Sequence, residues 1–180
     1  MINILRTLRM SVLIGIFLLS CEGTENSELV DLEFDANVLT KLKAEADAET
    51  VMKAVADKKG SVVLLNMWAT WCEPCVEEFP DIIMLHNKYK DKGLEVITVS
   101  FDFVPSVADS FLAAQKTNFT NYLKSQEQDE HYFIIGIDED WYGALPATWL
   151  FDRNGERRYL VQDRFETEEL EKKIVELLEK

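Results

Sequence analysis

The 180-residue sequence predicts an α/β fold, in which a central mixed β-sheet is flanked by helices on both faces. Two continuous apolar runs, Ser61 to Met67 and Leu94 to Phe101, are typical of central strands that a parallel sheet buries on both faces. Segments with helical signals alternate with these runs. Near the end of the chain, Asn154-Gly155 favours a tight hairpin turn. A hairpin joined to parallel strands makes the sheet mixed.

The first 20 residues resemble a bacterial lipoprotein signal peptide. Arg6 and Arg9 form a short basic region, and the apolar stretch that follows is too short to span a bilayer as a helix. The stretch ends in Leu18-Leu19-Ser20-Cys21, which resembles a lipobox because a small residue precedes the cysteine. We therefore expect residues 1–20 to be removed and Cys21 to carry lipid.

The residues after Cys21 are acidic and polar, so we expect residues 21–36 to form a flexible tether and residues 37–180 to form the folded domain. Acyl chains on Cys21 would anchor the protein to a membrane, at about 0.8 kcal/mol per buried CH₂ group. This arrangement places the protein in the cell envelope, facing the periplasm or the exterior.

The domain is predicted to begin with an edge strand and a helix. Val38 to Lys43 alternates apolar and polar side chains, which is typical of an edge strand. Asp47 is suited to the N-cap of a helix over residues 48–58, and Gly60 is suited to end it. The first apolar run follows directly.

A long helix is predicted over residues 73–91, with Gly93 as its stop. Pro80 should kink this helix, because proline removes an intrahelical hydrogen bond. After the second apolar run, Pro105 is suited to the first position of a helix that extends to about Lys116.

The next segment carries weaker signals. Residues 117–130 are polar, and a short helix around Tyr122 is the one element expected there. Tyr132 to Ile137 predicts a short strand. Thr148 to Asp152 and Arg157 to Gln162 predict the two strands of the hairpin.

The chain is predicted to end in a helix from Thr167 to Lys180. Thr167 is suited to its N-cap, and Glu168 and Glu169 place negative charge in the first turn, where the helix dipole favours it. The sequence has no internal repeat and no low-complexity tract.

Two cysteines separated by two residues carry the chemistry that the sequence predicts. Cys72 and Cys75 follow the first apolar run and stand at the start of the long helix, which is the local architecture of a thiol–disulfide oxidoreductase. A helix N-terminus stabilises the thiolate, which is the nucleophile. We expect Cys72 to attack, and Cys75, one turn further and more buried, to resolve the mixed disulfide.

A structural zinc site is the alternative interpretation of this cysteine pair. Zinc takes four ligands, usually from a second cysteine pair or two histidines. The remaining candidates are Cys21, His86 and His131, and their spacing does not match a ligand set. We therefore expect no metal and no cofactor.

The residues around the cysteines carry a family resemblance. The run from Asn66 to Cys75, NMWATWCEPC, followed by Glu78-Phe79-Pro80, resembles the thioredoxin-like superfamily and is most similar to the TlpA/ResA-type membrane-anchored reductases. The run from Gly143 to Asp152 resembles the second signature of that superfamily, a cis-proline loop that enters a strand. The resemblance covers residues 38–178. It implies a thioredoxin-like fold in which residues 102–138 supply an inserted helix and strand.

The resemblance also implies roles for residues near the cysteines. Glu78 would be partly buried, with a raised pKa, and would move the proton of Cys75. A solvated glutamate on the helix surface stays open as the alternative. Asn66 departs from thioredoxin, which has a buried Asp at this position, and an amide cannot relay a proton. Glu73 and Pro74 would tune the redox properties of the pair, because the charge of Glu73 opposes thiolate formation.

Further residues are expected to contact substrate. The resemblance implies that Pro146 is a cis-proline that brings the backbone of Leu145 next to Cys72, where it can pair with an extended substrate. Trp71 and Trp141 are expected to flank the same surface as an aromatic platform. Packing of Trp141 in the core is an open alternative.

The function implied by the resemblance is a lipid-anchored reductase of disulfides in secreted proteins. Apocytochrome c is a frequent substrate of such proteins, and a membrane thiol donor would supply electrons. A thiol peroxidase of the same fold stays open as an alternative, although Leu65 and Ala69 replace the Pro and Thr of its motif. A copper-delivery lipoprotein also stays open, because two thiolates suit Cu(I).

The net charge of −14 argues against a nucleic-acid partner, because binding to phosphates depends on Lys and Arg. The acidic surface would instead keep the domain soluble and away from anionic lipid.

Overall fold

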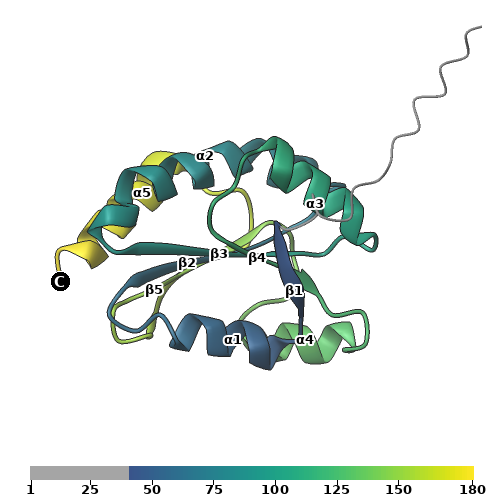
Figure 1. The fold of residues 1–180 in the computed structure, drawn as a ribbon. Helices are drawn as coiled ribbons and strands as arrows, with labels where there is room; N and C mark the ends of the chain where they lie inside the picture. Colours follow the sequence, from purple (N-terminus) through teal and green to yellow (C-terminus); the bar gives the residue numbers. More distant parts are fainter. Residues whose placement is uncertain (1–40) are drawn as a thin grey trace, which may run out of the picture. The chain divides into compact units, whose positions relative to one another are not determined.

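The computed structural model describes residues 41–180, in which a six-stranded sheet lies between two layers of helices (Figure 1). The sheet has the strand order β1-β4-β3-β2-β5-β6. The first four strands in this order are parallel to one another, and β5 is antiparallel to both β2 and β6. The predicted mixed sheet is therefore confirmed. Its strands are β1 (Leu42–Ala46), β2 (Val62–Trp68), β3 (Leu94–Ser100), β4 (Thr120–Lys124), β5 (Ala147–Phe151) and β6 (Arg157–Val161).

Helices cover both faces of this sheet. Figure 1 shows α2, α3 and α5 on one face and α1 and α4 on the other. A short 3₁₀ helix, η1 (Lys90–Lys92), continues α2. The helices are α1 (Ala48–Ala56), α2 (Glu73–Tyr89), α3 (Pro105–Ala114), α4 (Glu130–Ile137) and α5 (Thr167–Leu178).

The sheet separates two hydrophobic cores, which explains the apolar run in β2. All seven residues of this strand are buried. Leu64 belongs to a cluster with Phe79 of α2, whereas Leu65 belongs to a second cluster with Phe133 of α4. Because successive side chains of a strand point to opposite faces, a strand between two helix layers must be apolar throughout.

Several predicted helix boundaries are confirmed. The Asp47 side chain accepts a hydrogen bond from the backbone N–H of Thr50 and caps α1. Gly93 follows η1 with a φ of 100°, which is the left-handed conformation that glycine adopts most readily. Pro105 is the first residue of α3, as expected.

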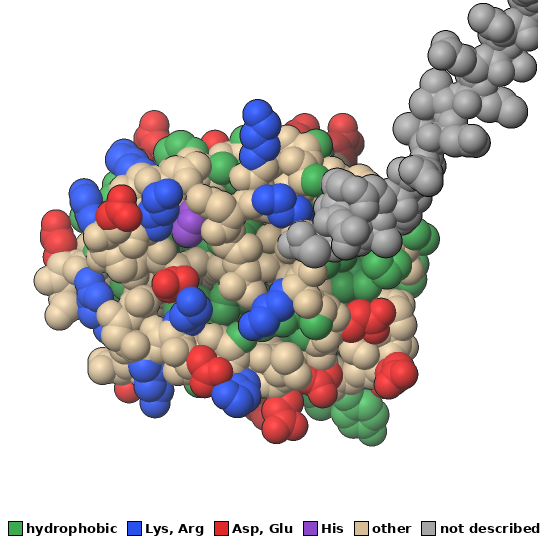
Figure 2. Space-filling view, in the orientation of Figure 1, with side chains coloured by type: hydrophobic (Ala, Val, Ile, Leu, Met, Phe, Trp, Pro, Cys, Tyr) green, Lys and Arg blue, Asp and Glu red, His purple; other side chains and the backbone are tan. Residues whose placement is uncertain are grey.

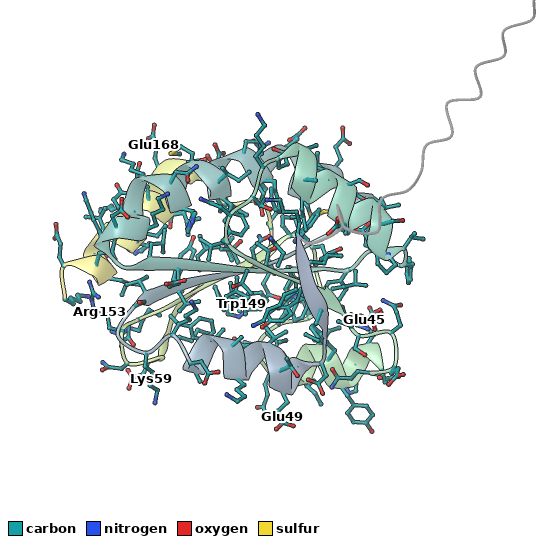
Figure 3. All side chains as sticks on the ribbon, viewed as in Figure 1. Glu45, Glu49, Lys59, Trp149, Arg153 and Glu168 are labelled. Atoms are coloured by element: carbon teal, nitrogen blue, oxygen red, sulfur yellow. A yellow bond between two sulfur atoms is a disulfide. The ribbon has the colours of Figure 1, made fainter. Side chains whose placement is uncertain are left out.

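The hairpin is also confirmed. The Asp152 side chain accepts hydrogen bonds from the backbone N–H groups of Asn154 and Glu156, and Gly155 has a φ of 81°. Arg153 lies at the end of the sheet near the C-terminal end of α5 (Figure 3) and donates to the carbonyl oxygen of Leu178. These contacts join the hairpin turn to the last helix.

The prediction of a short helix around Tyr122 is wrong, because residues 120–124 form β4 between β1 and β3. The sequence did not predict this strand because residues 117–130 are mostly polar. The buried amide of Asn121 accepts from Thr98 Oγ1 and donates to the carbonyl oxygens of Lys41 and Phe119. A buried polar residue costs little free energy once its hydrogen bonds are satisfied.

The prediction of a strand over Tyr132 to Ile137 is also wrong, because this segment lies in α4. Its aromatic and β-branched residues favour strands in general. Here the Asp129 side chain accepts from two backbone N–H groups and caps a helix. Phe133 and Ile137, four residues apart, then point into one core.

Smaller differences concern the ends of elements. β1 is an edge strand, as predicted, but it begins at Leu42, and residues 38–40 lie outside the described residues. The N-cap of α5 is Glu166 rather than Thr167, because the Thr167 hydroxyl donates to Asp81 Oδ2 and not to its own helix. The insertion over residues 102–138 contains α3, β4 and α4, where the resemblance implied one helix and one strand.

Charged side chains are interspersed on the face that Figure 2 shows. Basic and acidic groups alternate there among polar and apolar atoms. Among the described residues, Lys53 pairs with Asp57 and Lys58 pairs with Glu95 at exposed positions. Such pairs contribute little to the free energy of unfolding.

Candidate active site

Cys72 and Cys75 are joined by a disulfide at the start of α2. Cys72 is the N-cap residue, and Cys75 lies in the first turn, with a Cα–Cα distance of 5.2 Å between them. Cys72 is 7% exposed and Cys75 is fully buried, so the first sulfur is the more accessible one. The expected difference in burial between the two cysteines is confirmed.

The loop before Cys72 is held by a buried carboxylate that the sequence analysis missed. Asp102 follows β3 and accepts hydrogen bonds from the backbone N–H and hydroxyl of Thr70 and from the hydroxyl of Ser100. The carboxyl ends of the parallel strands β2 and β3 lie at the same edge of the sheet. This adjacency was the available signal, because polar residues that follow neighbouring parallel strands meet at that edge.

Pro146 follows a cis peptide bond with Leu145, as the sequence analysis expected. Pro146 is buried directly before β5, and Leu145 lines the same pocket as Cys72. The structure therefore brings the proline loop and the cysteine loop to one surface. Glu73 and Pro74 are exposed there and line the pocket too.

Glu78 lies on α2, three residues after Cys75, and is 1% exposed. Its carboxyl accepts hydrogen bonds from Asn66 Nδ2 at 2.9 Å and from the backbone N–H of Phe165 at 3.3 Å. Burial raises the pKa of Glu78 to about 7, although these hydrogen bonds and the nearby charge of Arg164 lower it. The expectation of a buried acid with a raised pKa is met, and a solvated position is excluded.

Asn66 contacts Glu78 directly, a connection that sequence reasoning did not find. Its Nδ2 donates to Glu78 Oε1 and to Thr148 Oγ1, both at 2.9 Å, so the amide links β2, α2 and β5. An amide has a donor end and an acceptor end of nearly the same shape, and its orientation is assigned from its partners. The same amide, rotated, would present its oxygen to a protonated Glu78. Asn66 can therefore bind either protonation state.

The two tryptophans expected at the substrate surface differ in position. Trp71 is 60% exposed and lines the pocket beside Cys72. Trp141 is 2% exposed, so the expected exposed platform is wrong for this residue. Its ring packs edge-on against Phe101 and against Trp149, which lies inside the domain (Figure 3), and its Nε1 donates to the carbonyl oxygen of Ala144. Trp141 packs in the core, the alternative that stayed open.

Other predictions concern metal and membrane. Within residues 41–180, no group of three or more His, Cys, Asp or Glu side chains is placed to hold a metal ion. No helix in that range combines the length and apolar character needed to cross a membrane. Cys21, the signal peptide and the tether lie outside the described residues.

Comparisons with known proteins agree with this geometry. A family model described as the AhpC/TSA family matches residues 35–160. The thiol-disulfide oxidoreductase ResA of Oceanobacillus iheyensis is 34% identical over 134 residues, which are 74% of this chain and 65% of that protein. ResA of Geobacillus kaustophilus is 28% identical and is also covered to 65%. The chain thus spans about two thirds of the length of these relatives.

Solved structures share the fold. A putative thiol:disulfide interchange protein DsbE from Chlorobium tepidum is 33% identical, with a TM-score of 0.59 over 69% of this chain and 84% of that chain. A secreted thiol-disulfide isomerase from Corynebacterium glutamicum is 17% identical, with a TM-score of 0.62 over 70% of this chain and 75% of that chain. The thioredoxin-like fold that the resemblance implied is therefore confirmed.

The raised pKa of Glu78 predicts a pH dependence of stability. Between pH 4.5 and about 7, the unfolded chain loses the Glu78 proton while the folded protein keeps it. The free energy of unfolding should therefore fall as pH rises through this range, by up to about 3 kcal/mol from this residue. Glu78→Gln should remove that part of the slope in urea unfolding.

Glu77→Gln is the matched control, because Glu77 is the exposed neighbour and pairs with Arg164. It should keep the slope of the unaltered protein between pH 4.5 and 7. If Glu78→Gln and the unaltered protein show equal slopes, Glu78 is not an acid with a raised pKa.

Proposed function

The chain belongs to the AhpC/TSA family and has a thioredoxin-like fold, and on this premise we propose that it is a thiol–disulfide oxidoreductase that reduces disulfides of secreted proteins. The observation that supports this proposal most is the buried carboxyl of Glu78, one helical turn from the buried Cys75. A structural disulfide has no need for an acid with a pKa near neutrality beside it. Perturbed pKa values are concentrated at functional sites.

In the proposed reaction, the reduced protein attacks first with Cys72. Its thiolate is the more accessible sulfur and stands at the N-terminus of α2, where free N–H groups and the helix dipole stabilise negative charge. A bond forms between Cys72 Sγ and one sulfur of the substrate disulfide, and the substrate S–S bond breaks. The departing substrate sulfur takes up a proton and becomes a thiol.

The second step resolves the mixed disulfide. Cys75 gives its proton to the Glu78 carboxylate and attacks Cys72 Sγ, and the second substrate sulfur leaves and is protonated. Two electrons pass from the protein dithiol to the substrate, and the protein is left with the Cys72–Cys75 disulfide found in the structure. A base with a pKa near the working pH is suited to this transfer.

Asn66 and Thr148 act as positioning residues in this scheme. Asn66 Nδ2 donates one hydrogen bond to Glu78 Oε1 at 2.9 Å. The same amide group donates its other proton to Thr148 Oγ1. Since the amide can donate to the carboxylate or accept from the acid, Glu78 keeps one position through both steps.

The wider setting is also part of the proposal. Residues 1–20 would be a signal peptide, Cys21 the lipid anchor, residues 21–36 a tether and residues 37–180 the catalytic domain. The domain would then face the periplasm or exterior, receive electrons from a membrane thiol protein and reduce secreted substrates such as apocytochrome c. The ResA relatives, named thiol-disulfide oxidoreductases, support the reaction class of this proposal.

The thiol peroxidase alternative has less support. Its motif needs a proline at residue 65 and a threonine at residue 69. Leu65 and Ala69 stand there instead, and both are fully buried in the two cores. The copper-delivery alternative predicts tight Cu(I) binding by the reduced protein without disulfide exchange, which a Cu(I) titration would reveal.

Trapping experiments test the roles of the two cysteines. After reaction with a disulfide-containing protein, Cys75→Ser should accumulate a mixed disulfide through Cys72, because the resolving sulfur is missing. Cys72→Ser should form none. Intact-mass spectrometry gives the yields. Equal yields of mixed disulfide from the two variants, or no mixed disulfide from either, would contradict the proposed order of attack.

The reduction potential of the cysteine pair tests the direction of electron flow. A potential at or below about −230 mV is expected, close to that of reducing thioredoxin-like proteins. A potential near about −120 mV would instead make the protein a disulfide donor. Equilibration with a thiol redox buffer, followed by mass spectrometry of the alkylated protein, measures it.

A further inference from the structure

A pocket of about 640 Å³ opens beside Cys72. Four segments of the chain form its wall: the cysteine loop, the residues after β3, the segment from the end of β4 to the start of α4, and the proline loop. Its volume lies within the range of sites that bind small molecules. Because Cys72 is in the wall, a group bound there would lie next to the attacking sulfur.

Aromatic and aliphatic side chains make up much of this wall. Trp71 is 60% exposed and Phe103 is 74% exposed, and Phe101 and Leu145 line the pocket with them. Trp71 and Phe103 lie in one wall, and an apolar group that covered them would remove apolar area from water at about 25 cal/mol per Å². The wall therefore favours an apolar guest.

The charged groups of the wall disfavour a charged guest. Glu73 and Glu130 repel a carboxylate, and Lys124 opposes the attraction that these two acids exert on a cation. A charged group placed against the apolar part of the wall would also lose hydration. Lys124 is only 7% exposed, and its ammonium donates to the carbonyl oxygens of Ser125 and Gln128. An uncharged side chain is the class of guest that avoids both the repulsion and the loss of hydration.

The ammonium of Lys124 also favours an aromatic ring over an aliphatic group. It lies 5.5 Å from the ring centre of Phe133 and 6.0 Å from that of Phe101. A cation within about 6 Å of an aromatic face is attracted by the ring electrons. A third ring in the pocket would gain the same attraction.

We propose that this pocket binds an aromatic side chain of the substrate polypeptide, close in sequence to the cysteine that Cys72 attacks. The inference rests on the proposed function and gives its substrate class: extended polypeptide segments with an aromatic residue near a disulfide. Folded proteins bury such residues, so the pocket selects chains that have not completed folding. The inserted segment, residues 102–138, contributes Phe103, Lys124 and Glu130 to the pocket. This segment would thereby determine which substrates bind.

Matched peptides test this selection. Each peptide carries one cysteine, joined in a disulfide to a small thiol, and differs at one position two residues away: Phe, Leu, Ala, Lys or Glu. The rate constant with the reduced full-length protein should be about 10-fold higher for the Phe peptide than for the Ala peptide. Leu should lie between them, and Lys and Glu should not exceed Ala.

Two variants locate the selection in the pocket. Phe103→Ala should reduce the ratio of the Phe to the Ala rate constant to about 2 or less. Tyr132→Ala is the matched control, because Tyr132 is a similarly exposed aromatic on α4 that does not line the pocket, and the ratio should stay near that of the unaltered protein. Lys124→Met should reduce the preference for Phe over Leu.

The outcomes separate this inference from the proposed function. If the unaltered protein reduces a small symmetrical disulfide but reacts at one rate with all five peptides, the pocket does not select substrates and the inference is overturned. The inference is also overturned if Phe103→Ala and Tyr132→Ala change the ratio of the Phe to the Ala rate constant equally. If the small disulfide itself is not reduced, the proposed function fails.

Discussion

The hydrogen bond between Asn66 and Glu78 is the interaction on which the rest of the site depends. A carboxyl group that is almost fully buried is costly to ionise, and the protein offsets part of this cost with one amide donor and one backbone N–H. The balance leaves the pKa of Glu78 at about 7. An isolated buried acid would stay protonated near neutral pH, and an exposed one would stay ionised, so the proposed exchange of a proton with Cys75 depends on this intermediate environment.

The fold supplies that environment from three directions. β2 carries Asn66 in the centre of the sheet, α2 carries Glu78 above it, and the segment before α5 closes the site with the N–H of Phe165. On the side of Cys72, Asp102 accepts hydrogen bonds from Thr70 and so fixes the loop before the cysteine. Cys72 therefore lines the pocket, while Cys75 is fully buried, one helical turn from Glu78.

The sequence predicted those parts whose signals are local. Two continuous apolar runs identified β2 and β3, and the spacing of Cys72 and Cys75 identified the disulfide pair at the start of α2. The resemblance to thioredoxin-like proteins supplied Glu78 and the cis peptide before Pro146. Each of these signals lies within a few residues along the chain.

The remaining parts depend on contacts between distant segments. β4 was missed because Asn121 is polar, and its burial is tolerated only through partners that the fold brings together. α4 was mistaken for a strand because packing overrides the preference of its aromatic residues. Asp102, the contact of Asn66 with Glu78, and the pocket around Phe103 require the strand order, which no local pattern in the sequence specifies.

The carboxyl ¹³C chemical shift of Glu78, followed by NMR from pH 4 to 9 in the oxidised protein, tests the central claim most directly. Glu78→Gln identifies the signal by its loss. We expect a titration midpoint near pH 7, since burial raises the pKa of Glu78 to about 7. A midpoint near the ordinary glutamate value of 4.5 would contradict the account, because Glu78 would then be too weak a base to accept the proton of Cys75.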